Sequence, residues 1–179
     1  MKPRSPRKIL HIVEDLKVGG LEKVLASIVS SLDPSKYDVQ VWCLARGGDV
    51  ADELVAQGVA LRILNMDNYH RPLQITALAR LMKTEQFDVI HTHGYFASTF
   101  GRLAAILARI PVVITHVHST YHDYGKRNLL IERFLSYFTD KIICISRAVE
   151  AFVTIDEGIS KKKICLIYNG VDFPDPVDA

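Results

Sequence analysis

The chain has 179 residues, which is enough for one domain with a substantial core and short for two domains that each bury their own core. Apolar residues make up 49% and charged residues 23%, a balance that excludes a chain disordered throughout. The formal charge of +2 excludes the strongly basic surface of a dedicated nucleic-acid-binding protein, so no nucleic-acid partner is expected.

The first residues, MKPRSPRK, are basic and precede the apolar segment ILHIVEDL, an order also found in secretory signals. Glu14 and Asp15 interrupt this segment and no small-residue cleavage site follows, so we do not expect a secretory signal. No apolar run reaches the length needed to span a bilayer. We therefore expect a cytoplasmic protein, and leave open a peripheral contact with the inner face of the plasma membrane.

Seven apolar segments of strand length alternate with helical segments along the chain: 9–13, 37–45, 59–64, 87–93, 111–118, 141–146 and 163–168. The clearest helical pattern follows the first of them, with apolar residues at helical spacing at Leu21, Val24, Leu25, Ile28, Val29 and Leu32. Because parallel strands need crossover connections, this alternation predicts a Rossmann-like, doubly wound α/β fold with a mostly parallel sheet and helices on both faces. Ligands in such folds bind outside the carboxyl ends of the strands.

One domain is expected over residues 1–172. The tail 173–179, FPDPVDA, has two prolines and two aspartates after the last strand, which is the composition of a linker. The three cysteines, Cys43, Cys144 and Cys165, are odd in number and lie in separate apolar runs, so we expect buried free thiols in a reducing compartment.

Gly19 and Gly20 stand where the chain turns from the first strand into a helix. The free amides of a helix N-terminus attract anions, and glycine lets an anion approach the backbone closely, so a phosphate could bind here. The sequence does not match the GxGxxG dinucleotide motif. A turn that only starts a helix is an equally good interpretation of these two residues.

Histidines close the fourth and fifth strands, in the segments His91-Thr92-His93-Gly94 and His116-Val117-His118-Ser119. Side chains alternate along a strand, so each pair of histidines at i and i+2 shares one face of the sheet. Imidazoles can donate to a phosphate, orient a hydroxyl or bind a metal, and four of them at neighbouring strand ends favour a functional site. No HExxH, CxxC, Asp or Glu accompanies them, so we expect no metal.

Two later features have ordinary structural explanations. Ser146 follows the sixth strand and precedes a helical segment, where serine usually caps the helix. Asn169 and Gly170 follow the last strand and form a turn signal.

Taken in order, the segments GGLEK, DVIHTHG, VVITHVHS, DKIICIS and IYNGVD resemble the N-terminal half of family 4 glycosyltransferases, which are retaining enzymes of GT-B fold. The resemblance covers about Ile9 to Asp172. It implies that Gly19 and Gly20 lie near the donor diphosphate, and that His118 acts in catalysis near the transferring sugar. It places His93, Gly94, His116 and Ser146 in the cleft or on its acceptor side. It places Asn169 and Gly170 at the hinge between two domains.

The resemblance further implies an acceptor-side domain that is inactive without a C-terminal domain, because GT-B enzymes form their active site between two halves. The expected partners are a nucleotide-sugar donor and a saccharide or lipid-linked acceptor, with no metal cofactor. A GT-B sugar-nucleotide epimerase and a stand-alone saccharide- or nucleotide-binding module remain alternatives. The segment 124–138 mixes basic and large apolar residues, which is typical of a membrane-surface helix, although a helix packing its apolar face on the sheet is favoured.

Overall fold

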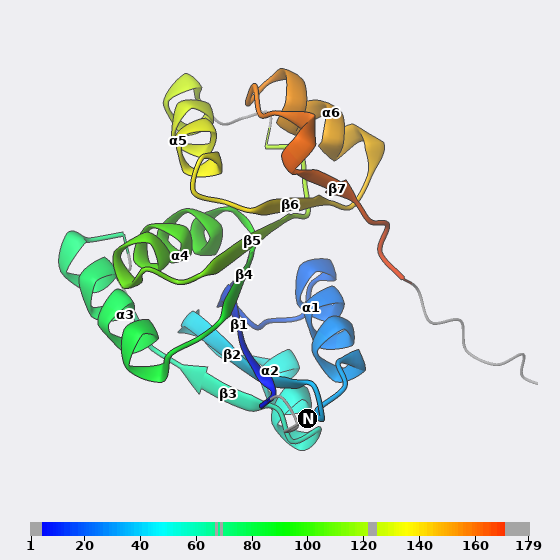
Figure 1. Cartoon of the computed structure of the whole chain (residues 1–179). Coiled ribbons are helices and arrows are strands. Elements are labelled where there is room, and N and C mark those ends of the chain that lie inside the picture. The colour runs from blue at the N-terminus through cyan, green and yellow to red at the C-terminus, as the bar shows by residue number, and fades with distance from the viewer. Residues whose placement is uncertain (1–4, 67, 69, 122–124, 171–179) are drawn as a thin grey trace, which may run out of the picture.

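A computed structural model describes residues 5–66, 68, 70–121 and 125–170. These residues form a seven-stranded parallel sheet in the order β3-β2-β1-β4-β5-β6-β7, with helices on both faces (Figure 1). This confirms the Rossmann-like, doubly wound fold. The expected linker, 173–179, lies outside the described residues, as do residues 171 and 172 at the end of the expected domain.

All seven expected strands are present: β1 Arg7–Asp15, β2 Tyr37–Arg46, β3 Ala60–Ile63, β4 Val89–His93, β5 Val112–Val117, β6 Lys141–Cys144 and β7 Ile164–Leu166. The acidic residues that end the apolar run of β1 do not end the strand, because Asp15 still pairs with Arg46 of β2 after a register shift. β5 ends one residue before His118, so this histidine lies just outside the sheet.

The connections are helical: α1 Gly20–Ser31, α2 Asp49–Ala56, α3 Pro72–Glu85, α4 Tyr95–Ala108, α5 Lys126–Ser136, α6 Arg147–Ile155 and a 3-10 turn Lys161–Lys163. α1 begins one residue before the expected apolar pattern and ends one residue before its last member. α3 and α4 are each followed by one residue in the left-handed conformation, Gln86 and Arg109, whose amide bonds back into the last turn.

Alternation along the strands divides the core into two faces. Val13, Val41 and Cys43 pack with side chains of α1 and α2, such as Leu25 and Leu54. Their strand neighbours point the other way and pack with α3 and α4, in a cluster that includes Leu10, Ile12, Trp42, Leu78, Met82 and Ala104. Ile142 and Cys144 of β6 pack with α6. Two apolar layers therefore hold the sheet between them.

The strands are added to the sheet first on one side of β1 and then, from β4 onward, on its other side. β2 and β3 lie to one side of β1, and β4 to β7 lie to the other side (Figure 1). In doubly wound folds the crevice at such a switch point, outside the carboxyl ends of the strands, is where ligands bind. The residues at the carboxyl ends of β1 and β4 are therefore the best candidates for ligand binding.

The cysteines are free in the structure, as expected. Cys43 and Cys144 are buried, whereas Cys165 is half-buried. Burial raises the pKa of the Cys43 thiol to about 11 and that of Cys144 to about 12, so both are poor nucleophiles at neutral pH. Among the described residues, no helix combines the length and the apolar character needed to cross a membrane.

Candidate functional site

Five imidazoles lie on one face of the sheet, where β1, β4 and β5 run side by side. His11 of β1 pairs in register with His91 of β4, and His93 of β4 pairs with His116 of β5. His118 follows two residues after His116. The four histidines of the predicted strand ends are thus brought together, and His11 joins them as a fifth member that sequence analysis missed. We call these five residues the histidine row.

The members of the row are in direct contact. His93 Nε2 lies 2.9 Å from His11 Nδ1, and His93 Nδ1 lies 3.3 Å from His118 Nε2. The ring centroids of His116 and His118 are 4.1 Å apart, and those of His91 and His93 are 4.3 Å apart. His93 therefore links the first strand to the residue after the fifth strand.

Burial keeps the row uncharged. Relative exposure is 0% for His93, 1% for His11, 4% for His116 and 8% for His91, whereas His118 is half-buried. Desolvation, and for some of them neighbouring histidines, lowers the pKa of His11 and His118 to about 3 and of His116 to about 4. The pKa values of His91 and His93 also fall well below 6.5. Neutral imidazoles can donate through one nitrogen and accept through the other.

Several ring nitrogens of the row have no hydrogen-bond partner although they are buried. They are His11 Nε2, His91 Nε2 and both nitrogens of His116. A buried polar atom without a partner costs about 1 to 3 kcal/mol, so such atoms are usually paired in folded proteins. Their concentration at the switch point indicates a site that pairs them with a bound group.

Gly94 connects the row to α1. It follows β4, caps α4, and has φ 75° and ψ 169°, a conformation that is essentially restricted to glycine. A Cβ atom at this position would lie 3.0 Å from Leu21 Cδ1 in the first turn of α1. Gly94 therefore allows the end of β4 to approach the start of α1 closely.

Gly19 and Gly20 lie at the start of α1, as expected. The Glu22 side chain folds over Gly19, because a Cβ atom there would be 2.2 Å from Glu22 Oε2, whereas the space around Gly20 is open. Burial raises the pKa of Glu22, while a hydrogen bond from its own amide lowers it. A carboxylate thus occupies the position where an anion was predicted, and a bound phosphate would displace it.

Ser146 caps α6, since its hydroxyl accepts a hydrogen bond from the amide of Val149 at 3.2 Å. This matches the structural explanation given for it above and leaves no hydroxyl role visible toward the row. Asn169 and Gly170 are exposed after β7, at the end of the described residues. Nothing in the described residues brings them to the histidine row.

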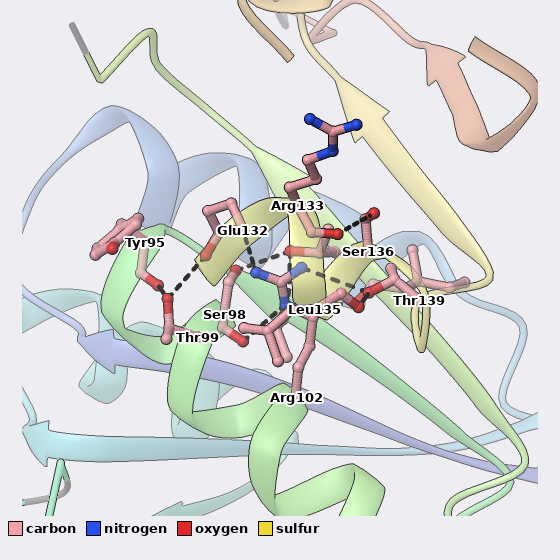
Figure 2. A network of polar contacts seen from close by, with 12 residues as sticks. Tyr95, Ser98, Thr99, Arg102, Glu132, Arg133, Leu135, Ser136 and Thr139 are labelled. Carbon is pink, nitrogen blue, oxygen red and sulfur yellow. Dashed lines mark hydrogen bonds and ion pairs between the residues drawn. The ribbon is translucent and has the colours of Figure 1, made fainter. Parts of the chain in front are cut away.

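Carboxylates approach the end of β5 from the opposite face, which sequence analysis did not foresee. A small pocket beside Thr115 and His116 is lined by Glu132 of α5 and by Glu157, which follows α6. Glu132 forms a buried ion pair with Arg102 of α4 and accepts a hydrogen bond from Thr99 at 2.9 Å (Figure 2). The signal available in the sequence was only that these acidic residues sit in amphipathic helical segments.

Glu157 is mostly protonated at neutral pH. Its relative exposure is 6%, and burial, followed by the nearby carboxylate of Glu132, raises its pKa to about 8, although Arg102 opposes the shift. A protonated carboxyl group can donate a hydrogen bond inside a pocket where a carboxylate could only accept. The two glutamates beneath β5 therefore differ in charge although they lie close together.

The sequence from residue 18 to residue 173 matches the model of glycosyltransferase family 4. This match covers most of the chain and includes the glycines of α1 and all of the histidine row except His11. The chain belongs to glycosyltransferase family 4. The membership favours a glycosyltransferase over an epimerase among the alternatives that the sequence left open.

Two curated relatives of this family 4 domain are bacterial glycosyltransferases. The chain is 27% identical over 177 residues to UDP-Gal:alpha-D-GlcNAc-diphosphoundecaprenol alpha-1,3-galactosyltransferase of Escherichia coli, covering 94% of this chain and 46% of the relative. It is 26% identical to the capsular polysaccharide biosynthesis glycosyltransferase CapH of Staphylococcus aureus, covering 92% and 47%. The chain thus spans about half the length of the curated relatives it matches.

A solved structure supports the fold of the family 4 domain. Anabaena HepE in complex with UDP and glucose superposes with a TM-score of 0.76 at 21% identity, covering 93% of this chain and 45% of that one. At this identity the likeness shows the shared fold and does not assign residues.

One expectation for the family 4 domain is confirmed only in part, since Leu135 is buried and Leu129 packs against the core cluster of β6 and α6. Helix α5 was expected to pack its apolar face on the sheet, yet Leu130, Phe134 and the following Phe138 are 64%, 57% and 47% exposed. The helix instead buries Glu132, together with Leu135 and Ser136. The buried Arg102 attracts Glu132 inward, and this turns the large apolar side chains outward.

Proposed function

We propose that this family 4 domain is the acceptor-side half of a retaining glycosyltransferase of cell-envelope or polysaccharide biosynthesis. The complete protein would transfer a sugar from a nucleotide-sugar donor to a saccharide or lipid-linked acceptor. The observation that carries the proposal is the row of five neutral imidazoles at the switch point, next to the start of α1, in a chain of this family. The diphosphoundecaprenol-linked substrate and the capsular polysaccharide named for its two relatives support this class of acceptor.

We assign the catalytic contact to His118. It is the half-buried member of the row, and it is held at one side by His93, so its ring can meet a substrate while its orientation stays fixed. A neutral imidazole can accept a hydrogen bond from a sugar hydroxyl or donate one to it. His93, His116 and Gly94 would then shape the acceptor side of the cleft.

We assign the donor diphosphate to Gly19 and Gly20. The amides at the start of α1 and the open space at Gly20 suit an anion, and Glu22 would swing away when the diphosphate binds. A developing negative charge is stabilised by such fixed donors by several kcal/mol, so no metal cation is required for the leaving group. In this proposal transfer proceeds without a metal cofactor.

The proposal requires a second domain. The chain covers 46% and 47% of the two relatives described above, which supports a half that completes its site with a C-terminal partner joined through the segment after Asn169 and Gly170. We expect little or no transfer by the 179-residue chain alone. Robust turnover by that chain would contradict the division of the site between two halves.

The test is an assay of the intact gene product with a panel of nucleotide sugars and with saccharide and lipid-linked acceptors. Transfer to an acceptor, with the anomeric configuration of the donor retained in the product by NMR, is the expected result. Interconversion of the nucleotide sugar without transfer would instead indicate an epimerase. Binding of UDP or saccharide with neither reaction would indicate a binding module.

We also propose that the domain touches the inner face of the plasma membrane through α5. The exposed Leu130, Phe134 and Phe138 lie on the same helical segment as the basic residues Lys126, Arg127 and Arg133. An apolar groove of about 330 Å³ runs between Phe134, Phe138 and side chains of α3 and α4. Apolar contact combined with basic charge is what binds a helix to an anionic lipid surface.

A further inference from the structure

Three members of the histidine row form a compact set of nitrogen ligands. The ligand atoms of His93, His116 and His118 all lie within 4.8 Å of one another. Two of these histidines stand at i and i+2 around the end of one strand, and the third comes from the neighbouring strand in register with His116. Three histidines on two adjacent strands can face a single ion from one side.

The spacing of two of these atoms suits a tetrahedral ion. Zinc binds imidazole nitrogen at about 2.0 to 2.1 Å, so two ligands of a tetrahedral zinc ion lie about 3.3 to 3.4 Å apart. His93 Nδ1 and His118 Nε2 are 3.3 Å apart. The ligand atom of His116 lies within 4.8 Å of the other two, and its ring, now stacked on that of His118 at 27°, has to turn toward the ion. Both of its nitrogens are buried without a partner, so no hydrogen bond opposes this turn.

The hydrogen bond to His11 prepares His93 for this role. If His93 Nε2 carries the proton and donates to His11 Nδ1 at 2.9 Å, the lone pair of His93 lies on Nδ1, which faces His118. An outer hydrogen bond that fixes the tautomer in this way is typical of metal-binding histidines. Because burial lowers the pKa values of the three rings, they are in the neutral form that binds metals.

A second set, His11, His91 and His93, also has its ligand atoms within 4.8 Å. All three of its members are buried, so none of them is open to solvent. His118 is half-buried and gives the first set a path for entry and room for a fourth ligand such as water. The open set is therefore the better site.

We propose that His93, His116 and His118 bind one Zn²⁺ ion, which inhibits the intact enzyme. Three neutral nitrogen ligands with an open fourth position suit zinc, and no carboxylate is needed to complete the set. Binding of zinc does not depend on the proposed function. Its inhibitory effect does, because the ion occupies the nitrogen of His118 that we assign to the substrate.

The binding test uses the untagged 179-residue chain and Co²⁺, a spectroscopic substitute for Zn²⁺. One equivalent of Co²⁺ should give the intense visible absorption of a tetrahedral complex, and Zn²⁺ should displace it stoichiometrically. His118→Gln, a change at a half-buried position, should weaken binding at least about 100-fold, since even outer-shell changes reduce metal affinity by 10- to 100-fold. His116→Gln should do the same, with its folding checked by circular dichroism.

His91→Gln is the matched control, because it removes a buried histidine of the row that belongs only to the closed set. It should keep the tetrahedral spectrum and the affinity. Absence of the spectrum in the unsubstituted chain, or its loss in His91→Gln but not in His118→Gln, would overturn the proposed site. Zinc binding by the chain, combined with no transfer activity in the metal-free intact gene product, would leave the metal site standing and reject the proposed function instead.

Discussion

His93 Nε2 lies 2.9 Å from His11 Nδ1, although 82 positions separate the two residues in the chain. The contact exists because β4 inserts beside β1 and sets His11 opposite His91 in the parallel register. On its other side His93 contacts His118. The orientation of the half-buried imidazole after β5 is thus fixed by a contact that begins on the first strand.

Replacing His118 by Ala should lower the turnover of the intact protein about 100-fold, a typical loss when a positioned group is removed. Stability should change by less than about 1 kcal/mol, because His118 is half-buried and its hydrogen-bond contact, with His93, is long at 3.3 Å. Initial rates and urea unfolding measure the two effects. His70→Ala, at an exposed histidine outside the row, is the control, and an unchanged rate in His118→Ala would remove this residue from the site.

Replacing Gly94 by Ala should destabilise the domain by about 1 to 3 kcal/mol. The substituted residue would have to keep a φ of 75°, and its Cβ would press on Leu21 at 3.0 Å. Gly125→Ala is the matched control, because Gly125 also caps a helix but has φ −61° and open space around its Cβ position. Thermal unfolding measures the stability of both variants. Equal losses of stability in the two would contradict the strain assigned to Gly94.

Replacing Arg102 by Met should cost about 3 to 5 kcal/mol, because it leaves the Glu132 carboxylate buried without a cation. The double variant Arg102→Met with Glu132→Leu should recover most of this loss, since both charges are then removed from the interior. Urea unfolding of the single and double variants provides the measurement. A double variant as unstable as the single one would mean that packing, and not charge, accounts for the loss.

The stability of the domain should contain a contribution from Glu157 that falls as pH rises. The fold raises the pKa of this carboxyl group from its ordinary value of 4.5 to about 8, so between these values the folded state binds more protons. Its stabilising contribution is therefore complete below about pH 4.5 and is lost as pH rises toward 8.

Unfolding measured from pH 5 to pH 8 for the wild type and for Glu157→Gln isolates this effect. The difference in stability should move in favour of the variant by on the order of 1 to 4 kcal/mol across the range. Comparing the two proteins removes the contribution of the buried histidines, whose lowered pKa values give the opposite slope. Glu53→Gln, at an exposed carboxylate of α2, should show no such trend.

Binding to vesicles should depend on the exposed apolar residues of α5. The double change Phe134→Glu and Phe138→Glu should reduce co-sedimentation with phosphatidylglycerol-containing vesicles at least about tenfold, because it removes apolar contact and adds negative charge. Val55→Glu is the control, since Val55 is 59% exposed on α2, which packs against β1 and β2 and not beside α5. Equal binding by the two variants, or binding that salt does not weaken, would contradict a site at α5.

The sequence alone determined the fold and the neighbourhood of the site. Alternation of strand-length apolar runs with helical segments leaves few ways to bury all of them, so the parallel sheet followed from the pattern. The period of two along a strand placed His91 with His93 and His116 with His118 on common faces. Because the carboxyl ends of parallel strands meet at one edge of the sheet, Gly19, Gly94 and these histidines could be placed together at that edge.

Only the tertiary structure decided what lies across from these residues. His11 stands within an apolar strand, and nothing local marks it; it joins the row because register between strands is set by the packing of the whole sheet. The local sequence pattern could not predict the orientation of α5 either. One buried ion pair between Glu132 and Arg102 outweighs the amphipathic arrangement of the helix and turns Phe134 to solvent. Local periodicity reports which residues prefer burial, whereas pairing of charges and strands depends on distant partners.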